Sequence, residues 1–187
     1  MFGLIAESPG QPAAGLFIER ISQIAERGCP CAHEGFTNYS EVLFTEYYYG
    51  KQAADEYLQG LRNIISNDIP IIGTYGVNKE GSGDMYPKGA NLLHTVRQII
   101  NNDSVFRSIL RGLNKDFYHQ TVTSKQVEDY FSQKSGKDLS KVFDQYLRTI
   151  MIPVLQLKTE GSILKYKWSN CIKGFNILRG YIIQPAD

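Results

Sequence analysis

Hydrophobic residues recur at helical spacing through most of the chain after residue 33. Residues 36–48 and 51–66 each carry an apolar stripe, and Gly50 between them is typical of a helix end. Four further stripes follow residues that are suited to helix starts, namely Pro87, Asp103, Thr123 and Asp138. The pattern predicts a mainly α fold in which about six helices pack as an irregular bundle.

The hydrophobic period changes near the end of the chain. Residues 152–159 and 162–169 alternate between apolar and polar positions on either side of Glu160-Gly161. This alternation predicts a β-hairpin that follows the helices. Because two strands alone are only marginally stable, the hairpin is interpreted as the start of a larger β domain.

Composition and charge exclude several classes of protein. The 187 residues are 42% hydrophobic, which is too apolar for a disordered chain. With Lys+Arg 20 and Asp+Glu 19, the net charge of +1 lacks the basic excess expected of a nucleic-acid or anionic-membrane surface. No apolar stretch approaches the roughly 18 residues of a membrane segment, and residues 1–12 lack the pattern of a signal peptide. The compartment therefore stays open.

The segment His33-Glu34-Gly35-Phe36-Thr37-Asn38-Tyr39-Ser40-Glu41 concentrates polar side chains at helical spacing. On a helix, Glu34, Asn38 and Glu41 lie on nearly the same face. Two carboxylates along one helical stripe suit a cation, with one as ligand and the other as its support. The alternative interpretation is a solvated acidic face.

The same segment resembles the zinc aminopeptidases of the alanyl aminopeptidase (gluzincin) family, whose motif reads [NH]-E-G-F-[AT]-x-Y-x-E. The resemblance implies that Glu34 is a zinc ligand and that Glu41 supports the metal site. Met85-Tyr86-Pro87-Lys88-Gly89-Ala90 resembles the family's Y-x-K-G segment, which implies that the Tyr86 hydroxyl stabilises the oxyanion. The complete enzyme would hydrolyse N-terminal residues of peptide substrates.

The family's upstream motifs are missing from the chain. Zinc in this class takes two histidines and a glutamate, and the histidines and the general base come from H-E-x-x-H. The family's spacing places that motif at residues 11–15, which read Gln-Pro-Ala-Ala-Gly, and the chain has only His33, His94 and His119. The G-x-M-E-N segment that binds the substrate's amino group is also absent. The sequence therefore predicts a fragment that is inactive on its own.

This interpretation divides the chain into three parts. Residues 1–32 form an atypical leader of uncertain fold, 33–150 the helical part of a thermolysin-like catalytic domain, and 151–187 the start of a truncated β-sandwich. An alternative function is a non-catalytic helical binding module derived from a peptidase, with exposed apolar surfaces that favour self-association.

A third interpretation places a small metal site near the start of the first regular helix. Cys29, Cys31 and His33 have the spacing C-x-C-x-H and precede Glu34 directly. Thiolates and imidazole are ligands that zinc accepts. These three residues are therefore weak alternative metal ligands.

Overall fold

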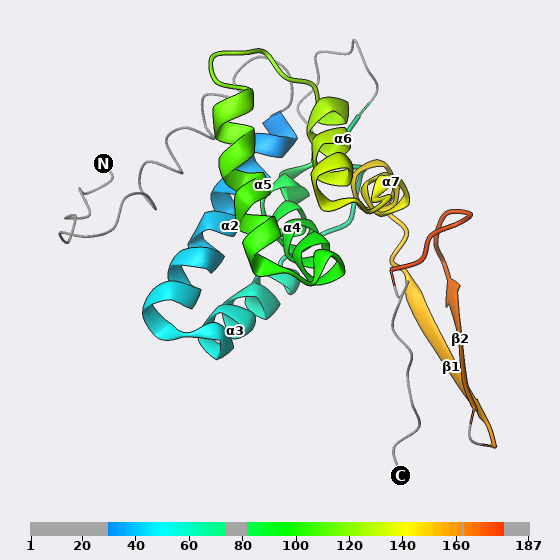
Figure 1. Cartoon of the computed structure of the whole chain (residues 1–187). Helices are drawn as coiled ribbons and strands as arrows, with labels where there is room; N and C mark the ends of the chain where they lie inside the picture. Colours follow the sequence, from blue (N-terminus) through cyan, green and yellow to red (C-terminus); the bar gives the residue numbers. More distant parts are fainter. Residues whose placement is uncertain (1–29, 74–81, 162, 178–187) are drawn as a thin grey trace.

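The computed structural model describes residues 30–73, 82–161 and 163–177. The helices gather in one body, and a β-hairpin extends from it (Figure 1). Within the described part the elements are α2 (Pro30–Tyr49), α3 (Lys51–Arg62), the 3-10 helix η1 (Gly83–Met85), α4 (Pro87–Ile100), α5 (Asp103–Asp116), α6 (Ser124–Ser135), α7 (Ser140–Arg148), β1 (Val154–Glu160) and β2 (Ile163–Ser169). The expectation of a mainly α fold with a hairpin is confirmed.

Helix α4 is the central element of the bundle. It contacts α2, α3, α5 and α7, and it also contacts η1. Ala90 and Val96 of α4 are completely buried, and even the polar Asn91 and Arg97 are at most 8% exposed. Most of α4 is therefore covered, so its buried polar residues have to find partners inside the protein.

Phe131 joins the helices that surround the core. This α6 side chain has no exposed surface. Its ring lies 6.2 Å from that of Phe36 on α2, 6.3 Å from that of Phe106 on α5 and 6.2 Å from that of Phe143 on α7, measured between centroids. One aromatic side chain thus links four helices that are distant in sequence.

Local sequence signals account for the ends of α6. The Thr123 side chain accepts a hydrogen bond from the Gln126 backbone N–H, and the Gln126 side chain accepts one from the Thr123 backbone, which completes a capping box. The helix ends at Gly136, whose φ of +66° suits glycine. Both features were predicted from the sequence.

Two other predicted helix starts are shifted by one or two residues. Asn102, and not Asp103, caps α5 by accepting a hydrogen bond from the Val105 N–H at 3.1 Å. Helix α7 begins at Ser140, and Asp138 accepts hydrogen bonds from the backbone N–H and the hydroxyl of that residue. Asp103 does not cap the helix, and its carboxylate accepts a hydrogen bond from the Arg97 guanidinium.

The hairpin has one apolar and one polar face. The strands are antiparallel, with Leu155 opposite Trp168 and Leu157 opposite Tyr166. Gly161 at the turn has a φ of +61°. Leu157 is 57% exposed, so part of the apolar face is open in the described structure.

The predicted leader, residues 1–32, lies almost wholly outside the described residues. Helix α2 begins at Pro30, before the boundary drawn at residue 33. Proline is well tolerated in the first turn of a helix, because the backbone N–H that it lacks would have no partner there.

Candidate functional site

The two motifs singled out in the sequence meet where α2 crosses α4. A Cβ atom placed on Gly89 would lie only 2.7 Å from the Gly35 Cα atom, and one on Gly35 would lie 3.1 Å from the Gly89 Cα atom and 3.3 Å from the Met85 carbonyl oxygen. Only glycine at both positions allows such a close approach of two helix backbones. The crossing brings the segment after Glu34 against the segment around Tyr86.

Glu34 and Tyr86 both reach the surface beside this crossing. Glu34 lies in the second turn of α2 and is half-buried. Tyr86 stands at the N-cap position of α4, directly before Pro87, and is 40% exposed. The structure thus brings together the backbone segments that carry these two predicted site residues.

We expect Gly89→Ala to weaken the fold, because the added methyl group has no room against the α2 backbone. Forcing an extra methylene into a packed site costs about 1–3 kcal/mol. Urea unfolding measures this loss in the free energy of unfolding.

Gly60→Ala is the matched control for this crossing. Gly60 lies within α3, and a Cβ there would meet nothing within 4 Å. Alanine is the better helix former, so this variant should be unchanged or more stable by up to ~1 kcal/mol. Equal stability of the two variants would contradict the proposed tight crossing.

The lysine of the Y-x-K-G segment binds neighbouring loops. Lys88 is 7% exposed, and its ammonium donates to the Asn67 side-chain oxygen at 2.7 Å and to the Thr149 carbonyl oxygen at 3.0 Å. Burial lowers the pKa of Lys88, while the nearby Asp84 carboxylate opposes that shift. Lys88 therefore fixes the start of α4 to the segments after α3 and α7.

Asp84 holds the segment before Tyr86 against the chain that follows α3. Its buried carboxylate accepts hydrogen bonds from the backbone N–H groups of Ser66 and Asn67, at 2.8 and 2.6 Å. These bonds hold the chain after α3 in a non-helical path, and α3 ends at Arg62 rather than at the predicted residue 66. Sequence reasoning missed Asp84 and Lys88 as positioning residues, because nothing local pairs them with residue 67.

Glu41 connects α2 to α3. Its exposed carboxylate accepts a hydrogen bond from the Tyr57 hydroxyl at 2.5 Å and a longer one from the Asn38 amide at 3.4 Å. Burial and the Glu41 carboxylate together raise the pKa of Tyr57 to about 12. The role of Glu41 in a metal shell stays a prediction.

A complete metal site is not formed by the described residues. No group of three or more histidine, cysteine, aspartate or glutamate side chains there is arranged to hold an ion. Cys29 lies outside the described residues, as do the side chains of Cys31 and His33. The C-x-C-x-H alternative therefore remains a prediction, and so does zinc binding by Glu34.

About half of the chain is similar in sequence to known proteins. Aminopeptidase 2, mitochondrial, of Saccharomyces cerevisiae is 23% identical over 105 residues, which make up 56% of this chain and 11% of that protein. The alanine/arginine aminopeptidase of the same yeast is 25% identical over 101 residues, or 54% of this chain and 12% of that protein. Over this stretch the chain is related to aminopeptidases.

A third relative gives the same result. Aminopeptidase 2 of Candida albicans is 25% identical over 105 residues, which cover 56% of this chain and 11% of that protein. The match thus spans only about a tenth of the length of each of these aminopeptidases. No family model and no solved structure matches the chain. No described helix is both long enough and apolar enough to cross a membrane.

Proposed function

We propose that this chain is a fragment of the catalytic domain of a zinc aminopeptidase. In the complete enzyme Glu34 is a metal ligand, Tyr86 donates to the oxyanion, and Glu41 orients the metal shell. The supporting observation is the contact between Gly35 and Gly89, which joins the two motifs that carry Glu34 and Tyr86. The relationship to aminopeptidases agrees with this proposal.

The chain supplies only part of the machinery that such a reaction needs. A catalytic zinc activates a bound water and polarises the scissile carbonyl, and it requires three protein ligands and a general base. Glu34 accounts for one ligand, and the other two ligands and the general base are missing because residues 11–15, where the family's spacing places H-E-x-x-H, read Gln-Pro-Ala-Ala-Gly. The residues present therefore do not fit a complete zinc site.

Tyr86 has a position suited to an oxyanion donor. The residue is 40% exposed, so a substrate can approach it, and its backbone is held by η1 on one side and α4 on the other. Asp84 and Lys88 hold the backbone on either side of Tyr86. A hydrogen-bond donor that is positioned in advance stabilises developing negative charge without reorganisation.

We expect the isolated chain to hold well below one zinc per molecule and to release no amine from alanine p-nitroanilide. Metal analysis of protein purified without added zinc measures the zinc content. The absorbance of released p-nitroaniline measures the peptidase activity. Glu34→Ala and the control Glu56→Ala, an exposed α3 residue, should match the unmodified chain. One zinc per chain that is lost only in Glu34→Ala would show that substitute ligands such as Cys29, Cys31 or His33 complete the site.

The coding DNA provides a separate test of the origin of the chain. The proposal expects codons for H-E-x-x-H, in one of the three frames, upstream of the codon for Glu34. Their absence from every frame would contradict a peptidase fragment, whatever the zinc content.

A further inference from the structure

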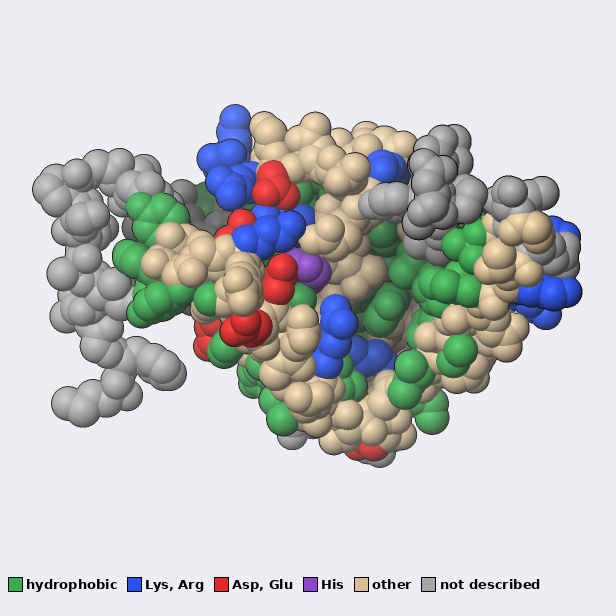
Figure 2. All heavy atoms as spheres, turned by 90° about the horizontal axis from the view of Figure 1, so that it is seen from below, with side chains coloured by type: hydrophobic (Ala, Val, Ile, Leu, Met, Phe, Trp, Pro, Cys, Tyr) green, Lys and Arg blue, Asp and Glu red, His purple; other side chains and the backbone are tan. Residues whose placement is uncertain are grey.

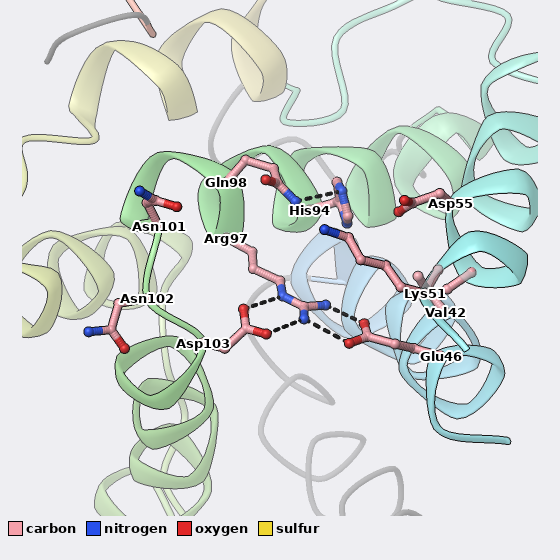
Figure 3. A pocket seen from close by; sticks show the side chains of 11 residues that line it. Val42, Glu46, Lys51, Asp55, His94, Arg97, Gln98, Asn101, Asn102 and Asp103 are labelled. Atoms are coloured by element: carbon pink, nitrogen blue, oxygen red, sulfur yellow. Dashed lines mark hydrogen bonds and ion pairs between the residues drawn. The ribbon is translucent and has the colours of Figure 1, made fainter. Parts of the chain in front are cut away.

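A charged cavity lies at the far ends of α2 and α4 from the glycine crossing. It has a volume of about 290 Å³ and opens between α2, α3, α4 and the start of α5. Figure 2 shows acidic and basic side chains crowded around a histidine on one face of the molecule, and Figure 3 shows Arg97 between Glu46 and Asp103. A volume near the lower limit of ligand pockets suits one small molecule.

The charges at the floor of this cavity already have partners. The Arg97 guanidinium donates to both carboxylate oxygens of Asp103, at 2.8 and 2.6 Å. It also donates to both oxygens of Glu46, one of them at 2.9 Å (Figure 3). These paired groups form a rigid polar floor that has little capacity to bind a ligand ion.

Two charges on α3 have no direct partner of this kind. Lys51 and Asp55 both line the cavity, and within the described part of the chain each acts on a lining residue only through its charge, Lys51 on Asp103 and Asp55 on His94. They are one helical turn apart, where Cβ atoms are about 5–6 Å from each other. A lysine that precedes the acidic residue is the weaker orientation for such a pair. The cavity thus offers one ammonium and one carboxylate side by side.

The charge of the whole lining disfavours simple ions. Lys51 and Arg97 are positive, while Glu46, Asp55 and Asp103 are negative, so the lining carries 2 − 3 = −1. Burial, followed by the nearby Arg97, lowers the pKa of His94, which therefore adds no charge at neutral pH. Excess negative charge repels an anion, and the Lys51 ammonium opposes a cation that binds Asp55 alone.

We propose that this cavity binds a small zwitterion of the α-amino acid class. The ligand's carboxylate accepts from the Lys51 ammonium, and its ammonium donates to the Asp55 carboxylate. Each free charge of α3 then gains a partner of opposite sign, and the net charge of the cavity is unchanged. Neither the metal nor the peptidase chemistry proposed above is needed for this binding.

Nuclear magnetic resonance titration of the full chain with L-leucine tests the proposal. We expect the backbone amide signals of Lys51, Asp55 and Asn101 to shift and to saturate in the millimolar range. Leucine amide lacks the carboxylate and 4-methylpentanoate lacks the ammonium, so each should bind at least about fivefold more weakly, the factor that corresponds to one ion pair.

Variants of Lys51 and Asp55 test the contacts to the ligand's carboxylate and ammonium separately. Lys51→Ala and Asp55→Asn should each weaken L-leucine binding about fivefold, whereas the exposed Lys115→Ala and Asp129→Asn should leave it unchanged. Because all four positions are at least partly exposed, the variants should stay folded, which circular dichroism checks. Signals that stay unshifted up to the solubility limit of L-leucine, or equal binding of 4-methylpentanoate, would overturn the proposal.

Discussion

Replacing Phe131 with alanine is expected to lower the free energy of unfolding by about 3–5 kcal/mol. The side chain is completely buried, and its ring packs against aromatic rings of α2, α5 and α7. The loss has two parts, which are the burial of the ring itself and the cavity that remains where four helices cannot collapse together. We therefore expect the largest destabilisation of any variant discussed for this chain.

Urea unfolding followed by circular dichroism measures this loss. Phe131→Leu keeps most of the buried volume and should cost less than half as much. Phe44→Ala is the control outside the core, because Phe44 is only partly buried and packs on the exposed Tyr48 at 4.5 Å between ring centroids. If Phe131→Ala cost no more than Phe44→Ala, the four-helix junction would not be the centre of the core.

The sequence was sufficient to predict which α-helices and β-strands form in the described part. Helical periodicity marked every α-helix of the described part, and alternation marked the hairpin, because most of these elements bury one face and expose the other. The start of α5 was misplaced by one residue since Asn102 and Asp103 are both good caps. The Asp103 carboxylate accepts a hydrogen bond from Arg97, six residues upstream, and Asn102 is left as the cap.

Long-range polar contacts explain where local prediction failed. The apolar stripe of α3 continues to Ile65, yet the helix ends at Arg62. The Asp84 carboxylate takes the N–H groups of Ser66 and Asn67, and no pattern within α3 contains this information. Where a residue of another element determines the end of a helix, the hydrophobic period of that helix does not predict the end.

The candidate site was predictable only in part. Motif resemblance singled out Glu34 and Tyr86, whereas the meeting of Gly35 and Gly89 depends on which helices cross and where. A glycine at or near the start of each helical pattern was the available signal, since glycines within helices often have a packing reason. Lys51 and Asp55 gave no signal at all, because charges on a helix surface are usually solvated.

Replacing Arg97 with methionine is expected to lower the free energy of unfolding by about 2–3 kcal/mol at neutral pH. Removing one member of a buried ion pair costs about 3–5 kcal/mol. Here Arg97 is 8% exposed, but its partners Glu46 and Asp103 are 20% and 54% exposed, so water partly compensates for the loss. The variant leaves two carboxylates close together without their shared cation.

The same ion pairs determine how this difference depends on pH. Hydrogen bonds from Arg97 hold the pKa values of Glu46 and Asp103 below their ordinary values of 4.5 and 3.8. A lowered pKa in the folded state adds stability above the ordinary value, and that stability is lost as pH falls through the folded pKa. The gap between the unmodified chain and Arg97→Met should therefore be full at pH 7 and should shrink below about pH 4.

Urea unfolding at neutral and acidic pH measures both effects, with Lys125→Met as the matched control. Lys125 pairs with Asp129 on the surface of α6, where both side chains are more than 60% exposed, so its loss should change little at either pH. A gap for Arg97→Met that stayed constant down to acidic pH would mean that lost packing of the long arginine side chain, and not its charge, stabilises the junction of α2, α4 and α5.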